Sequence, residues 1–344
     1  MKKTKWTKLL SALLFLTVML VGCGNTPDDS SDSTSEGSSA AVESPVTDFE
    51  YEENEDSGIT ITKYIGEDIE VMIPGKIEGK DVTKIGKGAF EYQRNIVSIK
   101  LPDTVTVIED DAFRSCIDLT AINFPQAMQV IGPRAFYECV QLAEVSLPNA
   151  LTKIGSSSFQ ECKSIKEIRI PNSITEWGGG AFSNSGIEKI IFDEGIESIG
   201  ESTFAATNIR EVVLPGSIKT IPALAFAGCK NLESVTLSDG ILTIENNVFG
   251  SRTIYGENAK LIEIVIPASV KNITEATFIG CKALEKVKFE GNAPENFALS
   301  PEEYEDINGN TFTSEIQGDY TVYYHEGAQG FTLPTWNDYT TETW

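Results

Sequence analysis

The sequence predicts a solenoid, a fold in which similar short units stack along one axis. A phenylalanine, most often preceded by alanine, recurs nine times within a similar stretch of residues. The eight intervals between successive phenylalanines measure 22 or 23 residues, except for the last, which measures 29. A near-constant period in this range is the signature of a repeat architecture. The repeat positions are Phe90, Phe113, Phe136, Phe159, Phe182, Phe204, Phe226, Phe249 and Phe278.

Each unit has two halves with different hydrophobic periodicities. In residues 142–148, Val145 and Leu147 alternate around Ser146 and are followed by Pro148, which predicts a short strand. In residues 131–142, the apolar positions step by four, four and three, which predicts one face of a short helical segment. Gly132 and Pro133 suit the start of such a segment. We therefore expect an α/β solenoid, with short parallel strands on one face and short helical segments opposite.

Stacking is required for this fold to be stable. A unit of some 23 residues buries too few apolar side chains to offset an ordering entropy of about 1 to 2 kcal/mol per residue. Neighbouring units add strand-to-strand hydrogen bonds and burial on both sides. The strand side of the stack is therefore expected to present an extended surface.

The unit also resembles a known family. Its pattern, Leu-x-x-Val-x-Leu-Pro-x-x-Val-x-x-Ile-Gly-x-x-Ala-Phe-x-x-Cys, is similar to the BspA-like class of bacterial leucine-rich repeat proteins, and residues 119–139, 142–162 and 232–249 follow it closely. The resemblance covers roughly residues 59–289. It implies a leucine-rich repeat arc, a place on the cell surface and a role in adhesion to host or neighbouring cells, and it implies no enzymatic activity.

The N-terminus has the features of an export signal. Residues 1–22 combine a basic start with an apolar run from Leu9 to Leu20, which is too short to span a bilayer. Leu20-Val21-Gly22-Cys23 resembles the bacterial lipobox, which implies lipidation of Cys23 and anchoring to the outer face of the cell membrane. Residues 23–48 are then the lipidated cysteine and an acidic, Ser-rich, disordered tether. An ordinary secreted protein with an incidental Cys23 is the alternative.

The array needs both of its apolar ends covered. We expect an N-terminal cap and first partial repeat at residues 49–85, the leucine-rich repeat array at residues 86–289, and a C-terminal cap segment at residues 290–344. The aromatic tail within the last segment suits a cap, because aromatic side chains carry a large apolar area. A sugar-stacking platform formed by Trp336, Tyr339 and Trp344 is the alternative.

Few residues offer chemistry. Apart from Cys23, the cysteines all occupy the position three after a repeat phenylalanine, so we expect buried free thiols rather than disulfides or a metal site. They are Cys116, Cys139, Cys162, Cys229 and Cys281. The single histidine, His325, cannot by itself form a histidine-rich metal site. Residues 306–310 only faintly resemble a calcium loop. We predict no catalytic residues, no metal and no cofactor.

The outward strand residues are the most informative positions. The predicted binding face comprises Glu144, Arg169, Lys189, Ile191, Glu211, Val213, Glu263 and Val265. Its exposed apolar side chains with charged neighbours are typical of a protein-binding surface, although β-propensity alone also accounts for isoleucine and valine in strands. The 29-residue interval adds a loop at residues 251–260 around Tyr255, which is either a second recognition element or a neutral insertion.

The net charge of the chain narrows the classes of partner that it can bind. The chain has 27 basic and 51 acidic residues and a formal net charge of -24, so nucleic acid is an improbable ligand. The interpretation that fits best is a lipid-anchored cell-surface protein that binds a protein or glycan through its strand face, with contact to the membrane through the lipid anchor only. The rival hypothesis is a cell-envelope hydrolase acting through acidic residues. A solute-binding lipoprotein would need two α/β lobes, which the repeats exclude.

Overall fold

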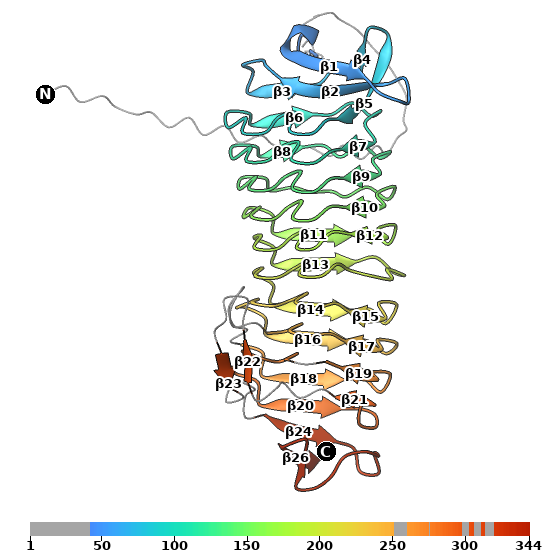
Figure 1. Ribbon diagram of the computed structural model, residues 1–344, viewed down its shortest axis with the longest axis vertical. Coiled ribbons are helices and arrows are strands. Elements are labelled where there is room, and N and C mark those ends of the chain that lie inside the picture. Colours follow the sequence, from blue (N-terminus) through green and yellow to red (C-terminus); the bar gives the residue numbers. More distant parts are fainter. Residues whose placement is uncertain (1–41, 251–259, 275, 298–302, 306–310, 314–319) are drawn as a thin grey trace, which may run out of the picture. The chain divides into compact units, whose positions relative to one another are not determined.

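The computed structural model describes residues 42–250, 260–274, 276–297, 303–305, 311–313 and 320–344. The chain separates into two units, residues 1–40 and 41–344, and every described residue belongs to the second. This second unit is a stack of coils, each of which contributes parallel strands to the same faces (Figure 1). No helix in the described part of the chain is long and apolar enough to cross a membrane.

One face, hereafter the strand face, carries the predicted parallel strands. Neighbouring coils pair in register here, as Glu167 does with Lys189 and Arg169 with Ile191. Inward side chains such as Ile168 are buried, because successive residues of a strand point to opposite sides. The strands are β3 (Glu70–Met72), β6 (Ser98–Lys100), β8 (Ala121–Ile122), β11 (Glu167–Ile170), β13 (Lys189–Phe192), β14 (Glu211–Leu214), β16 (Ser234–Leu237), β18 (Glu263–Ile266), β20 (Lys286–Phe289), β24 (Thr321–Tyr324) and β26 (Tyr339–Thr343).

A second face carries another parallel ladder, which the sequence analysis did not predict. Most of its strands contain two residues, and the second residue of each, such as Ile131 or Ile154, is usually buried. Its strands are β2 (Ile59–Tyr64), β5 (Lys80–Ile85), β7 (Val107–Ile108), β9 (Val130–Ile131), β10 (Lys153–Ile154), β12 (Glu176–Trp177), β15 (Thr220–Ile221), β17 (Thr243–Ile244), β19 (Asn272–Ile273) and β21 (Asn296–Phe297).

The remaining elements lie near the two ends of the unit or beside the stack. At the N-terminal end, the 3-10 helix η1 (Val46–Asp48) leads into β1 (Phe49–Glu53), which pairs antiparallel with β2, and β4 (Lys76–Ile77) pairs antiparallel with β5. At the C-terminal end, β25 (Thr335–Trp336) pairs antiparallel with β26, which itself continues the strand face from β24. The short strands β22 (Glu303–Glu305) and β23 (Thr311–Thr313) form a separate antiparallel pair.

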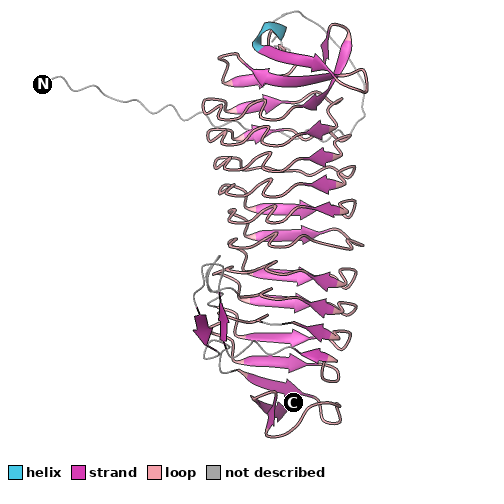
Figure 2. Cartoon of the chain, viewed as in Figure 1, coloured by secondary structure: helices cyan, strands magenta, loops and turns pink. Residues whose placement is uncertain are grey.

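The prediction of helical segments opposite the strands is wrong. Within the described residues η1 is the one helical element, and Figure 2 shows turns where helices were expected. In the coil of Phe136, both Arg134 and Glu138 have positive φ, of 54° and 62°, which a right-handed helix does not permit. Cys139 donates its amide to the carbonyl of Phe136 at 3.1 Å, three residues back, whereas Phe136 donates to Ser158 of the next coil at 2.7 Å. Consecutive four-residue turns thus produce the spacing that resembled a helix.

The side of the stack that these turns form is hereafter the turn face. Behind it, the core contains a ladder of aromatic rings. The repeat phenylalanines are buried and stack directly on one another, with centroids 5.1 Å apart between Phe136 and Phe159 and 6.2 Å apart between Phe226 and Phe249. Tyr64 extends the ladder at the N-terminal side by stacking on Phe90. At the other end, Tyr320 meets the last ring, Phe278, edge-on. The ladder gives each coil the same apolar contact on both sides.

The strand-face ladder is interrupted at three places within the described residues. The predicted strand at residues 142–148 is absent, so β8 and β11 belong to different sheets, and neither β13 and β14 nor β16 and β18 are paired. Before two of these interruptions stands a phenylalanine at a position that is leucine or isoleucine in most other coils: Phe192 ends β13, and Phe124 lies two residues after the end of β8. The ring of Phe124 reaches 6.2 Å from that of Phe159 in the next coil. The size of this residue does not account for the lost pairing by itself, because β20 ends in Phe289 at the same position and still pairs in register with β24.

Candidate binding face

The structure brings the predicted outward residues together on the strand face. Arg169, Lys189 and Ile191 follow one another on β11 and β13, whereas Glu211 and Val213 lie on β14. Glu263 and Val265 lie on β18. Glu144 is the exception, because it lies in the coil that has no strand.

Apolar side chains form the middle of this surface. Ile191 is 37% exposed between half-buried neighbours on β13, and Val213 is 61% exposed between buried neighbours on β14. Val265 is half-buried, so it contributes less contact area than predicted. In the sheet that contains β14, Val213 pairs with Thr236 of β16, whose methyl group continues the apolar row.

Charged pairs border this apolar row on its N-terminal side. Lys189 Nζ lies 2.8 Å from Glu167 across the register of β11 and β13. Arg169 donates to Asp193 at 2.6 Å and to Asn149 at 3.3 Å. Exposed ion pairs of this kind contribute only about 0 to 1 kcal/mol each to stability, so their main effect here is to set the charge pattern that a partner meets.

A second charged group borders the row on its C-terminal side. Lys288 Nζ lies 2.7 Å from Glu263 and 4.9 Å from the ring centroid of Trp344. His325 stacks on Trp344 with centroids 4.6 Å apart. The Trp344 ring therefore already has two close neighbours, an ammonium and an imidazole.

The other two aromatic residues of the possible sugar platform lie inward. Trp336 is only 8% exposed and packs 4.7 Å from Phe297, centroid to centroid. Tyr339 stacks on Tyr320 at 4.5 Å, and burial raises the pKa of Tyr320 well above its usual value. The three residues do not form one open aromatic surface, because two of them contact the core and only Trp344 is exposed.

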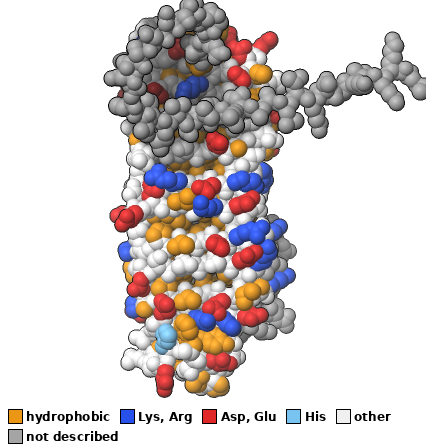
Figure 3. All heavy atoms as spheres, turned by 180° about the vertical axis from the view of Figure 1, so that it is seen from behind, with side chains coloured by type: hydrophobic (Ala, Val, Ile, Leu, Met, Phe, Trp, Pro, Cys, Tyr) orange, Lys and Arg blue, Asp and Glu red, His pale blue; other side chains and the backbone are white. Residues whose placement is uncertain are grey.

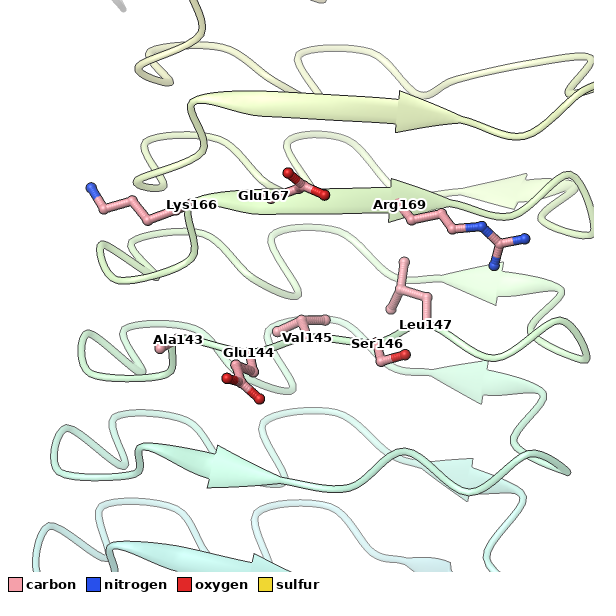
Figure 4. A pocket seen from close by; sticks show the side chains of 8 residues that line it. All are labelled: Ala143, Glu144, Val145, Ser146, Leu147, Lys166, Glu167 and Arg169. Atoms are coloured by element: carbon pink, nitrogen blue, oxygen red, sulfur yellow. The ribbon is translucent and has the colours of Figure 1, made fainter. Parts of the chain in front are cut away.

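A groove opens on the strand face beside the missing strand. It has a cavity volume of about 390 Å³ and lies between residues 143–147 and β11, with Lys166, Glu167 and Arg169 on its far wall (Figure 4). Val145 is half-buried, and Leu147 extends from its coil toward β11 in the same view. The sequence analysis missed this groove. Its sequence carries no clear signal, because residues 142–148 follow the strand pattern of the other coils.

The cysteines lie in the core, away from this face. Cys116, Cys139, Cys162, Cys229 and Cys281 are buried free thiols. Each Sγ donates a hydrogen bond to the carbonyl of the repeat phenylalanine one coil earlier, at 3.1 or 3.2 Å. Burial raises the pKa of Cys229 to about 11 and that of Cys281 to about 12. The thiols therefore stay protonated and serve as hydrogen-bond donors inside the stack.

An ionic and aromatic cluster on the turn face was not predicted. Arg134 donates to both carboxylate oxygens of Asp111, at 2.7 and 2.8 Å, and this hydrogen bonding lowers the pKa of Asp111. The guanidinium of Arg114 lies 5.5 Å from the ring centroid of Tyr92 and 5.8 Å from that of Tyr137. Figure 3, which views the molecule from behind, likewise shows basic side chains beside acidic ones. Most of these charges are thus arranged to link successive coils.

Some predicted sites lie outside the described residues. These are the lipidation site Cys23, the loop residue Tyr255 and the faint calcium motif at residues 306–310. Among the residues that the structure describes, no group of three or more His, Cys, Asp or Glu side chains could hold a metal ion.

Comparison with solved structures identifies the same fold in other bacterial proteins. A leucine-rich repeat protein from Bacteroides ovatus matches 88% of this chain and 77% of its own length, with a TM-score of 0.67 and 23% identity. A leucine rich cell surface protein from Faecalibacterium prausnitzii matches 77% of this chain and 96% of its own length, with a TM-score of 0.54 and 21% identity. At these identities the likeness concerns the fold alone.

Comparison at the level of sequence identifies the family. No curated protein matches the chain. The model of the BspA type leucine rich repeat region matches residues 83–207, 129–255, 197–300 and 251–314, which together cover more than half of the 344 residues. The chain therefore belongs to the BspA-type leucine-rich repeat family.

Proposed function

We propose that this protein is exported, anchored to the outer face of the bacterial cell membrane through a lipid on Cys23, and binds a macromolecular partner through its strand face. The observation that carries the binding proposal is the row of outward apolar side chains around Ile191 and Val213, which is bordered by ion pairs on both sides. A dry centre with a polar rim is the usual anatomy of a protein interface.

The stack suits this role because it holds the row rigidly. The strands that carry Ile191 and Val213 rest on the aromatic ladder through inward residues such as Phe192, whose ring packs against that of Phe204, and the buried Leu214. Side chains that are already ordered lose little entropy when a partner docks, so modest contacts spread over a long surface suffice for affinity. Adhesion to host or neighbouring cells is the process that such a surface serves best.

The export and anchoring parts rest on the leader and on a relative. The leader in residues 1–22 and the lipobox-like Leu20-Val21-Gly22-Cys23 support lipidation, and the similar protein from Faecalibacterium prausnitzii is described as a cell surface protein. Radiolabelled palmitate incorporation in a bacterial host tests this part. Label in the wild type that disappears in Cys23→Ser is the expected result, and equal label in both would refute the anchor.

The binding part is tested on arrays of host matrix proteins, mucins and glycans. The test variant carries Ile191→Asp, Val213→Asp and Val265→Asp. Its matched control carries Ser198→Asp, Thr220→Asp and Thr243→Asp, which add the same charge away from the strand face.

We expect the array ligand to be lost by the test variant and kept by the control, with all three proteins melting at similar temperatures. Equal binding by all three proteins would move recognition away from the strand face. The loop around Tyr255 and the aromatic tail are the regions to examine next in that case.

A further inference from the structure

Strand β1, at the N-terminal end of the stack, has one edge that no other described strand covers. The sheet of the second face runs in the order β1-β2-β5-β7-β9-β10-β12, so β1 is its first strand and pairs on one side only, with β2. Within the described part of the chain, no further coil follows on the other side of β1 (Figure 1). An edge at the end of a stack has room for an additional strand, whereas an edge between two coils does not.

The pairing with β2 shows which main-chain groups of β1 face outward. Beyond one end of β1, Asn54 donates its amide to the carbonyl of Gly58 at 2.9 Å. Beyond the other end, the carbonyl of Asp48 accepts the amide of Ile65 at 2.8 Å. Residues of an antiparallel strand turn alternately toward and away from their partner strand, and the one-residue bulge of this pair lies on β2 rather than on β1. Positions 49, 51 and 53 are therefore turned away from β2.

Most main-chain groups along this outward edge have no partner among the described residues. The amide of Phe49 is already used, because it donates to the carbonyl of Val46 in η1. Its carbonyl remains, together with the N–H and C=O groups of Tyr51 and Glu53, which have no hydrogen-bond partner in the described part of the chain. Such a row is what an extended peptide needs to add itself to a sheet, because its main chain then supplies affinity while its side chains supply specificity.

The side chains of β1 select the chemistry of the added strand. Glu50 and Glu52 are exposed on the outer side of β1 and have no ion pair among the described residues. Tyr51 lies on the inner side, half-buried, and its hydroxyl donates to Glu78 at 3.2 Å. The side chains of an added strand alternate in the same way, so those beside the two glutamates should be basic and those beside Tyr51 should be apolar.

Charge disfavours two other occupants of this edge. A second copy of the chain would set its own Glu50 and Glu52 against the same residues, and like charges directly opposite each other are destabilising. Residues 24–41 of this chain are near in sequence, but they contain three aspartates, one glutamate and no lysine or arginine. The occupant that the charges favour is therefore a basic segment of another protein.

We propose that the open edge of β1 binds an extended segment of a partner protein, with alternating basic and apolar side chains, as an additional strand of the second face. This site is separate from the strand face that carries Ile191 and Val213. The inference therefore goes beyond the proposed function and does not depend on it. Failure of the strand-face test would leave this proposal standing, and the reverse also holds.

The test uses the full chain and two fluorescent, amidated heptapeptides, in which valine alternates either with lysine or with glutamate. Binding is measured by fluorescence anisotropy, and we expect the lysine peptide to bind at least tenfold more tightly than the glutamate peptide. The lysine peptide is then remade as two isomers, N-methylated either at its three valine amides or at three lysine amides. A strand that pairs with β1 uses only one of these sets toward that edge. We therefore expect one isomer to bind at least tenfold more weakly than the parent and the other to bind within threefold.

A charge reversal on the protein tests the selection of the partner. The variant Glu50→Lys with Glu52→Lys should bind the glutamate peptide more tightly than the lysine peptide. Its matched control, Glu194→Lys with Glu197→Lys, changes two other exposed glutamates and the same net charge away from this edge. We expect the control to keep the preference of the wild type for the lysine peptide.

Two variants of Tyr51 test the main-chain hydrogen bond. Tyr51→Pro removes an N–H that faces outward, a place where an edge strand tolerates proline, and Tyr51→Ala removes the same side chain but keeps that N–H. We expect the proline variant to bind the lysine peptide at least tenfold more weakly than the alanine variant. If the proline variant does not fold, the two N-methylated isomers still decide the question on the wild type.

Several results would overturn the proposal. Equal binding by both N-methylated isomers, or the same change of preference in the edge variant and its control, would show only a general attraction of a basic peptide to an acidic chain. The absence of any binding by the lysine peptide would show that the glutamates merely keep the edge unpaired. If binding occurs only after residues 24–41 are deleted, the chain's own segment occupies the edge and the proposal of a partner protein is wrong.

Discussion

Truncation of one ring in the middle of the aromatic ladder, Phe159→Ala, tests what holds the stack together. The Phe159 side chain is fully buried and lies 5.1 Å from the ring centroids of both Phe136 and Phe182. Replacement of a buried phenylalanine by alanine typically lowers the free energy of unfolding by about 3 to 5 kcal/mol. Each stacked pair adds about 0.5 to 1.5 kcal/mol beyond area, and this site has two such pairs, so we expect a loss near the upper end, about 5 kcal/mol.

The assay is urea unfolding followed by circular dichroism of the β signal, with the exposed ring of Tyr92 as a control. Tyr92 is 50% exposed, and Tyr92→Ala should lower the free energy of unfolding by about 1 kcal/mol or less. Because each coil contacts only its neighbours, Phe159→Ala should also broaden the transition or divide it into two. A loss of about 1 kcal/mol or less for Phe159→Ala would refute the view that the ladder is the core of the fold.

Three further predictions concern pH, thiols and strand pairing. Because Arg134 lowers the pKa of Asp111, that carboxylate stabilises the fold above its unfolded pKa of about 3.9 and stops doing so as pH falls through its native value, so Asp111→Asn should reduce the acid-induced part of unfolding in a pH titration. In a Cys23→Ser background, the five buried thiols should not react with Ellman's reagent at pH 8 until the protein unfolds, and stability should fall above pH about 8.5 as unfolded thiols ionise; rapid labelling of the native protein would contradict their burial. Phe124→Leu should leave residues 143–147 unpaired, because Phe289 at the equivalent position does not prevent β20 from pairing with β24; slower amide hydrogen exchange in residues 143–147 would show instead that the Phe124 ring holds the coil apart.

Much of the fold can be predicted from the repeat period of the sequence. A phenylalanine every 22 or 23 residues and the alternation of inward residues in segments such as 167–170 predict the stack and most of the strand face. These features depend on contacts that every coil repeats, so a local pattern reports them faithfully. The buried thiols follow for the same reason, because each cysteine occupies the same place in its coil.

The turn face could not be predicted from hydrophobic spacing alone. Ile131, Ala135 and Cys139 are four residues apart both on a helix and on a run of four-residue turns, and all three are buried in the structure. What separates the two conformations is the positive φ at Arg134 and Glu138, residue types that carry no strong signal for it. The ladder of short strands on the second face was not predicted either, because these strands are mostly two residues long.

The groove escaped prediction because it arises from a difference between coils. Residues 142–148 match the strand pattern as well as their neighbours do, yet they lie outside the sheets. Pairing of this coil depends on contacts with its neighbours, such as that of Phe124 with Phe159, which lies 35 positions further along the chain. Long-range packing of this kind overrides local strand propensity.

The affinity of a single-residue variant tests the central claim, recognition through the strand face, most directly. Val213 is the most exposed apolar residue of the predicted face at 61%, whereas Thr220 is an exposed residue of the second face. With the ligand found on the array, biolayer interferometry should give a Kd at least tenfold weaker for Val213→Asp than for the wild type, and an unchanged Kd for Thr220→Asp. Unchanged affinity for Val213→Asp, or the same loss for both variants, would contradict recognition through the strand face.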